Sequence, residues 1–260
     1  MANDLATVKR DVAIANRILA EVGLASGVLA SLGHASMRFP DDPEHFVVKG
    51  RGYVLDALAV MQPDDMVVCN LEGFKVEGRP ELNPPSEVKM HSCIYRSRPE
   101  VQSVVHVHPR FTVVMGILQT QLRPMCLEGM QLVNKPLPVF ASPRLIVTEK
   151  DGIEVAQTLG DGRAILLQGH GAATVGSNLE DSFMTMFQLE EQARMNWYAY
   201  CAAGPDHGYT PPEKVAEHSA NSRLISEQPH LKPEQPRAGR REAGGVWAYY
   251  THLALMQMEA

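Results

Sequence analysis

Apolar residues recur at helical spacing at the start of the chain, at Val8, Val12, Ala15, Ile18, Leu19 and Val22. Steps of three and four residues place such side chains on one face of a helix. Gly23 is typical of the residue that follows a helix C-terminus. The pattern therefore predicts an amphipathic helix that ends near Gly23.

Short apolar and β-branched runs predict strands further along the chain. They occupy residues 33–39, 46–48, 66–68, 101–107, 139–140 and 164–167. Asp41-Asp42-Pro43 predicts a turn between the first two. Helices are predicted between these runs, at residues 86–95, where Ser86 resembles an N-cap, and at 113–118 and 152–159. Because helices and strands alternate, we predict one α/β domain, residues 1–203, with helices on both faces of a sheet.

A long helix is predicted from Asn178 towards Cys201, because Asn178 and Asp181 resemble a capping box. Prolines at positions 205, 211, 212, 229, 233 and 236 then favour an extended arm, because proline breaks long elements. Residues 246–258, which include Tyr249, Tyr250 and His252, are apolar and aromatic again. We predict that residues 204–260 pack on the domain or on a neighbouring subunit; a loose tail is the alternative.

Composition indicates a globular protein without a nucleic-acid partner. Of 260 residues, 45% are hydrophobic and 21% charged, which suits one large core. The net charge of -6, with one short basic stretch from Arg237 to Arg241, argues against phosphate-backbone binding. No apolar run reaches the length of a membrane span, and the charged N-terminus does not resemble a signal peptide. The scattered Cys69, Cys93, Cys126 and Cys201 indicate reduced thiols, so we expect a cytoplasmic protein without a membrane partner.

Three histidines predict a divalent metal site. His106 and His108 lie two residues apart at a strand end, so their side chains project to the same side. His170 lies between Gly169 and Gly171, directly after the strand at 164–167, and the glycines leave its imidazole uncrowded. The His-x-His pair alone is a weak signal, but three imidazoles at two strand ends favour one bound ion. Zinc, manganese and cobalt all suit such ligands.

Glu87 is a fourth candidate for this site. It lies in the first turn of a predicted helix, where the helix dipole favours a carboxylate. An ordinary capping role is the alternative that this position leaves open.

Four motifs resemble the class II aldolase/adducin family: LGHASMR from Leu32, PSE from Pro85, SRPEVQSVVHVHP from Ser97 and LLQGHGAATVGSNLEDSF from Leu166. The resemblance covers residues 7–203. It implies a three-layer α/β/α fold, usually assembled as a fourfold tetramer with sites between subunits. It also implies that His106, His108 and His170 bind the metal, and that Glu87 is an acid/base that can touch the metal as well.

Three positions differ from the sugar-phosphate members of that family. Their Gly-Asn-x-Ser is Gly33-His34-Ala35-Ser36, their Ser-Gly phosphate loop is Lys49-Gly50-Arg51-Gly52, and their paired serines are Pro85-Ser86. Phosphate sites rely on small residues and backbone N–H groups, whereas Arg51 can bind a planar carboxylate. We therefore expect Lys49, Gly50, Arg51 and Ser86 to bind substrate; a solvated turn is the alternative for Lys49 and Arg51.

These departures, the helix at 189–199 and the aromatic C-terminal extension resemble the decarboxylase branch of the family. They predict a metal-dependent (Mn²⁺, Zn²⁺ or Co²⁺) non-oxidative decarboxylase of a hydroxylated aromatic or pyridine dicarboxylate in aromatic catabolism. Substrates of the 3,4-dihydroxyphthalate or 3-hydroxypyridine-dicarboxylate type are expected, with Glu87 or His34 moving the proton. One alternative is an aldolase, epimerase or dehydratase acting on a sugar phosphate or a small hydroxy-carbonyl compound. Another is a non-catalytic, adducin-like scaffold. A homotetramer or larger assembly is expected.

Overall fold

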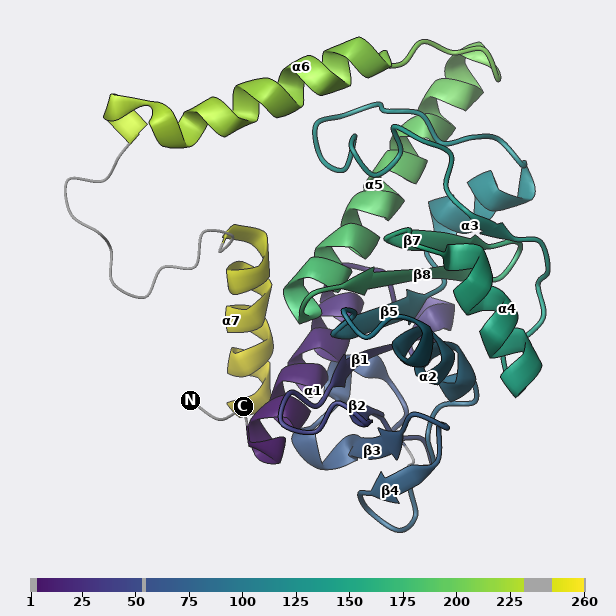
Figure 1. The fold of residues 1–260 in the computed structure, drawn as a ribbon, viewed down its shortest axis with the longest axis vertical. Helices are drawn as coiled ribbons and strands as arrows, with labels where there is room; N and C mark the ends of the chain where they lie inside the picture. Colours follow the sequence, from purple (N-terminus) through teal and green to yellow (C-terminus); the bar gives the residue numbers. More distant parts are fainter. Residues whose placement is uncertain (1–3, 53–54, 232–244, 260) are drawn as a thin grey trace.

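One mixed sheet occupies the centre of the molecule (Figure 1). The structure is a computed structural model that describes residues 4–52, 55–231 and 245–259. The strand order across the sheet is β4-β3-β2-β1-β5-β8-β7-β6, and each neighbouring pair is antiparallel except the parallel β6 and β7. The strands are β1 (His34–Arg38), β2 (His45–Lys49), β3 (Met66–Asn70), β4 (Lys75–Glu77), β5 (Ser103–Val107), β6 (Val139–Phe140), β7 (Ala164–Leu167) and β8 (Gly171–Gly176).

Helices cover both faces of this sheet. One apolar core lies between the sheet and α1, α3 and α5, and a second lies between the sheet and α2 and α4. The helices are α1 (Leu5–Glu21), α2 (Val88–Ser97), α3 (Arg110–Ile117), α4 (Glu149–Leu159), α5 (Leu179–Ala203), α6 (Pro212–Arg223) and α7 (Gly245–Glu259). Short 3₁₀ turns are η1 (Gly27–Leu29), η2 (Leu58–Val60), η3 (Pro63–Asp65), η4 (Leu224–Glu227) and η5 (Pro229–Leu231).

Side-chain alternation along the strands produces the two cores. On β5, Val105 and Val107 face α1 and α5, whereas Val104 faces α2 and α4. Burial on both sides explains why the strands read as continuous apolar runs in the sequence. The three-layer α/β/α arrangement that was predicted is confirmed.

Most predicted elements are present, with local differences. Asn178 caps α5 by accepting the N–H of Asp181, as the motif predicts. Ser86 does not cap α2; the residue before the helix is Glu87, and Ser86 lies in the preceding turn. Strands β4 and β8 were not predicted, because β8 is built from small residues and β4 is short and largely polar.

The C-terminal region is less extended than its prolines suggest. Pro211 and Pro212 lie at the N-cap and first position of α6, where a missing N–H does no harm, so they start a helix instead of breaking one. Beyond it, α7 lies alongside α1 (Figure 1), with the Trp247 ring 5.2 Å from that of Phe183. The basic stretch at 237–241 and the prolines at 233 and 236 lie outside the described residues. None of the described helices is long and apolar enough to cross a membrane.

Candidate metal centre

His106 is fixed on the central strand β5. Its Nδ1–H donates a hydrogen bond of 2.9 Å to the carbonyl oxygen of Ala172 on the neighbouring strand β8. An imidazole that donates from Nδ1 carries its lone pair on Nε2. The sheet therefore presents the bare Nε2 of this buried side chain for ligation.

His108 and His170 converge on the same point. The Nε2 atoms of His108 and His106 are 3.2 Å apart, so the two side chains project to one side as the spacing predicts. His170 follows β7, and the rings of His108 and His170 have centroids 4.7 Å apart. A Cβ atom at Gly171 would lie 2.4 Å from the Val107 carbonyl oxygen, so only glycine allows this close approach.

Glu87, directly before α2, faces the three imidazoles. Its Oε1 accepts the N–H of Ile146 at 2.9 Å, which turns Oε2 towards Nε2 of His106 at 3.2 Å and Nε2 of His170 at 3.4 Å. Burial alone would raise the pKa of Glu87, but the imidazoles of His106 and His170 reverse this and hold that pKa well below its usual range. Glu87 is therefore an ionised carboxylate, and a mere capping role does not account for where its oxygens point.

This set fits a divalent cation. One ligand atom from each of Glu87, His106, His108 and His170 lies within 4.8 Å of the others. Within the described part of the chain, neither ring nitrogen of the buried His170 makes a hydrogen bond, although Nε2 lies 3.4 Å from Glu87 Oε2. Buried polar atoms without a partner are unfavourable, and a bound metal ion would supply the missing partner. Burial and the neighbouring His106 and His170 lower the pKa of His108 to about 3, so its imidazole is neutral, as ligation requires.

A cleft of about 130 Å³ opens beside these side chains. Glu87 and His108 line it from the metal centre. They are joined by the predicted catalytic residue His34 and by three of the predicted substrate-binding residues, Lys49, Arg51 and Ser86. Gly50 is not part of the lining; its N–H donates to the Asp65 carbonyl oxygen at 2.7 Å. The structure thus brings together the predicted residues except Gly50.

Asp56, which the sequence did not single out, joins the two cations of the cleft. Lys49 Nζ lies 2.6 Å from Asp56 Oδ1, and Arg51 Nε lies 2.9 Å from Oδ2. Lys49 is 1% exposed, so it is not part of a solvated turn, whereas Arg51 is 39% exposed. Burial lowers the pKa of Lys49, although Asp56 opposes that shift. One carboxylate shared by two cations leaves a net positive corner in the cleft.

Comparison with known proteins places this geometry in a family. Residues 10–197 match the class II aldolase and adducin N-terminal domain. The chain belongs to the class II aldolase and adducin family. A 3,4-dihydroxyphthalate decarboxylase of Terrabacter sp. (strain DBF63) is 30% identical over 224 residues, which cover 83% of this chain and 90% of that protein. The predicted family and its decarboxylase branch are therefore confirmed.

Solved structures of class II aldolase proteins share the fold. An aldolase II superfamily protein from Pseudomonas syringae has a TM-score of 0.76 at 18% identity, covering 100% of this chain and 94% of its own. L-Fuculose-1-phosphate aldolase from Thermus thermophilus has a TM-score of 0.62 at 31% identity, covering 77% of this chain and 96% of its own. Decarboxylases and aldolases are both lyases, so this family member is a lyase, and the adducin-like scaffold alternative is set aside.

Two buried polar residues beside the site, His91 and Tyr95, were not singled out from the sequence. His91 and Tyr95 follow Glu87 at steps of four residues, so they lie on the face of α2 that meets the sheet, and Ser36 meets them from β1. Burial, and then the nearby His106, lowers the pKa of His91 to about 3. The i, i+4, i+8 spacing from Glu87 was the signal that would have found the two helix residues.

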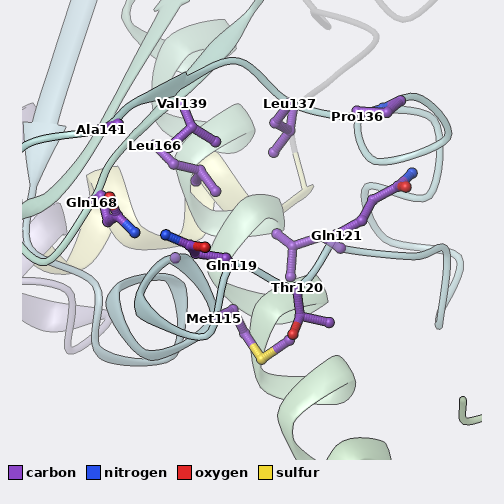
Figure 2. Close-up of a pocket in the computed structure, with 12 residues that line it drawn as sticks. Met115, Gln119, Thr120, Gln121, Pro136, Leu137, Val139, Ala141, Leu166 and Gln168 are labelled. Carbon is purple, nitrogen blue, oxygen red and sulfur yellow. The ribbon is translucent and has the colours of Figure 1, made fainter. Parts of the chain in front are cut away.

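A larger hollow of about 340 Å³ lies next to the His170 loop, between α3 and β6 (Figure 2). Its walls are mostly apolar, and the amide ends of Gln119 and Gln168 point towards one another inside it. None of the residues that line this hollow is titratable, and none is a metal-ligand candidate. This hollow therefore offers no acid, base or metal ligand for catalysis.

Proposed function

We propose that this lyase is a metal-dependent, non-oxidative decarboxylase of a hydroxylated aromatic or pyridine dicarboxylate. The observation that carries the proposal is the positive corner formed by Lys49 and Arg51 in the same cleft as Glu87 and His108. A planar guanidinium suits a carboxylate, and a dicarboxylate supplies one group to be held and one to be lost. Substrates of the 3,4-dihydroxyphthalate or 3-hydroxypyridine-dicarboxylate type match these requirements.

Sequence identity does not separate this function from aldol chemistry, since a decarboxylase and an aldolase are about equally similar to the chain. The composition of the cleft favours the decarboxylase. A phosphate cradle needs small residues and free backbone N–H groups. Here the N–H of Gly50 donates to the Asp65 carbonyl oxygen, and the N–H of Arg51 donates to the Asn83 carbonyl oxygen. These two N–H groups are therefore not free to bind a phosphate.

Each side chain of the cleft has a place in the reaction. Arg51 and Lys49 hold the carboxylate that stays, which orients the ring towards Glu87. The ionised Glu87 first accepts a proton from a hydroxyl group of the substrate. Glu87 or His34 then delivers a proton to the ring carbon as the other carboxylate leaves as CO₂. His106, His108, His170 and Glu87 would hold the divalent ion, which supplies Lewis acidity to the substrate oxygens where charge develops.

The test is CO₂ release from a panel of hydroxyaromatic and hydroxypyridine dicarboxylates. The metal-free enzyme is assayed after reloading with Mn²⁺, Zn²⁺ or Co²⁺, and a parallel sample keeps EDTA. We expect release from at least one member of the panel, abolished by the chelator. No release from an enzyme with stoichiometric metal would contradict the proposal and favour aldol cleavage of a sugar phosphate, assayed next.

The enzyme is expected to work as a homo-oligomer in the cytoplasm. Apolar side chains are exposed close to the site: Ile117 and Leu118 at the end of α3, and Leu145 and Val147 in the loop before α4. Leu145 also lines the cleft, and Ile117 lies against Gly169, beside the metal ligand His170. A neighbouring subunit that covers these side chains would close the cleft from outside.

A further inference from the structure

A chain of short hydrogen bonds runs from the core to the cleft. It joins the Tyr95 hydroxyl to Ser36 Oγ, Ser36 Oγ to His91 Nδ1, and His91 Nε2 to His34 Nδ1, each at 2.7 Å. All four side chains are buried, and His34 is the member that lines the cleft. The direction in which the hydrogens point decides which tautomer His34 adopts.

The Tyr95 end fixes the direction. Within the described part of the chain, the acceptor within reach of the Tyr95 hydroxyl is Ser36 Oγ. A buried hydroxyl without an acceptor is unfavourable, so Tyr95 donates to Ser36. Arg38 holds this end in place: its guanidinium carbon lies 4.8 Å from the Tyr95 ring centre, and its Nη2 donates to the Tyr95 carbonyl oxygen at 2.6 Å. The cation above the ring also favours the phenol as a donor.

The remaining hydrogens follow in order. Ser36 has one hydroxyl hydrogen, and its partners besides Tyr95 are His91 Nδ1 at 2.7 Å and the Val104 carbonyl oxygen at 3.5 Å. The shorter contact is the better bond, so Ser36 donates to His91 Nδ1. A neutral His91 then carries its hydrogen on Nε2 and donates it to His34 Nδ1. His34 is left with its hydrogen on Nε2, the nitrogen that remains for the cleft.

We infer that Tyr95, Ser36 and His91 are positioning residues that lock His34 as a neutral Nε2–H donor towards a substrate oxygen in the cleft. The inference deepens the proposed function and rests on it for the identity of that oxygen, a carboxylate or phenolate of the substrate. A neutral imidazole that donated its last proton would become an imidazolate, which is unfavourable in a buried site. His34 therefore acts as a hydrogen-bond donor and leaves the movement of the proton to Glu87.

Two substitutions of His34 separate a donor from a proton shuttle. Glutamine can place an N–H near the position of Nε2 but cannot shuttle a proton, and leucine can do neither. We expect H34Q to lower kcat by roughly tenfold and H34L by roughly a hundredfold or more, the range for loss of one preorganised donor. Equal losses in both variants, with metal content unchanged, would overturn the donor role.

The positioning residues are tested at Ser36. S36A removes the hydroxyl that orients His91, and we expect a fall in kcat of roughly tenfold with little change in KM or metal content. S36T keeps the hydroxyl and should recover most of this loss. An unchanged kcat in S36A would mean that the hydrogen bonds from Tyr95 through Ser36 and His91 do not influence His34.

Neutron diffraction from crystals of the perdeuterated wild-type enzyme decides the arrangement without any turnover. Deuterium on Nε2 of both His34 and His91, with both Nδ1 atoms bare, is the expected result. Deuterium on Nδ1 of His34 would overturn the inference, even if S36A fails to fold. This measurement needs no substrate. If His34 shows the expected tautomer but the enzyme releases no CO₂ from any substrate, only the proposed function is contradicted.

Discussion

At the residue scale, hydrogen bonds orient part of the candidate metal centre before any ion binds. The Ala172 carbonyl fixes His106 and the Ile146 N–H fixes Glu87, so two of the four ligands are held by the backbone. His170 differs, because its ring nitrogens lack hydrogen-bond partners within the described residues. The imidazole of His170 is thus the ligand whose orientation depends most on the bound ion.

Replacing His170 with alanine tests this dependence. We expect H170A to lose stoichiometric metal after dialysis and to lose activity by roughly a hundredfold or more, because one of the candidate ligands is removed. The measurement is metal content by elemental analysis together with CO₂ release. H230A, at an exposed histidine in η5, is the matched control and should retain both. Full metal content in H170A would remove His170 from the ligand set.

The proposed role of Arg51 in binding the substrate carboxylate can also be measured directly. Its partly exposed guanidinium shares Asp56 with the buried Lys49. R51A should raise KM by roughly tenfold to a hundredfold and change kcat less, since loss of a charge-assisted contact mainly weakens binding. Steady-state kinetics against a dicarboxylate substrate give both constants. R79A changes an exposed arginine paired with Glu81 and serves as control. An unaltered KM in R51A would take Arg51 out of the substrate site.

Much of the site was predictable from residue types and spacing, and part of it was not. His106, His108 and His170 are indicated by their spacing and by the glycines around His170, and the structure brings them together with Glu87. Asp56 was not predictable, because its role depends on how the loop after β2 folds back on Lys49. A short polar segment carries no periodicity from which such a contact could be inferred.

At the element scale, the position of His108 depends on how closely β8 passes β5. Gly171 is the first residue of β8. A Cβ atom added there would lie 2.4 Å from the carbonyl oxygen of Val107 and 3.2 Å from the α-carbon of His108. The carboxylate of Glu190 on α5 accepts the N–H groups of Phe111 and Thr112, which anchors the first turn of α3 directly after His108. Contacts with both β8 and α5 therefore fix the backbone around this ligand.

Adding one methyl group at Gly171 should disturb this packing. G171A forces the β5 and β8 backbones apart, and we expect stability to fall by about 1–3 kcal/mol, the range for overpacking, together with weaker metal binding. Urea unfolding and metal titration measure the two effects. Gly208, whose added Cβ atom would contact nothing within 4 Å, provides the control G208A. If both variants bind metal equally well, the close approach is not needed for the site.

The elements themselves were largely predictable, and the exceptions have physical causes. The run at 164–167 matches β7 to the residue because four apolar residues in a row have no solvated face. Strand β8 escaped prediction because alanine and glycine carry little hydrophobic signal. The arm was predicted to be extended, and this is wrong for α6, because a proline at the first position of a helix is tolerated whereas one inside it is not.

At the scale of the whole molecule, buried neutral histidines make the metal-free protein sensitive to acid. The pKa of His91 is about 3 in the folded protein, against an ordinary 6.5 in the unfolded chain. Below about pH 6.5 the unfolded state takes up a proton that the folded state does not. The stability that His91 contributes is therefore present above pH 6.5 and is lost as the pH falls towards 3.

Urea unfolding of the EDTA-treated protein at pH 7.5, 6 and 5 measures this effect. We expect the free energy of unfolding to fall by about 1.4 kcal/mol per pH unit for each such histidine once the pH is below about 6. H91Q, which cannot titrate, should show a slope shallower by about that amount. Parallel slopes for the two proteins, measured at one protein concentration, would show that His91 is not kept neutral by folding.

Assembly is a second property of the whole molecule. Ile117 and Leu118 leave an apolar surface on α3 that a second copy of the chain would cover. Light scattering should give a mass several times the 28.6 kDa of one chain, and I117D should reduce it towards that value, since burying an unpaired carboxylate is costly. I153D, at an exposed isoleucine on α4, is the control and should leave the mass unchanged. A monomeric wild-type protein would rule out shared sites.

The pairing of His34 with His106 across β1 and β5 has a consequence for folding. Side chains alternate along a strand, so a slip of one residue between β1 and its neighbours would turn His34 to the opposite face of the sheet and leave Ala35 in its place. The register of β5 against β8 governs His106 in the same way, through its opposite residue Ala173. Because His106 is a candidate metal ligand and His34 is not, metal uptake reports whether β5 has paired correctly with β8. Retention of a stoichiometric ion can serve as a quality check that separates refolded protein from chains trapped out of register.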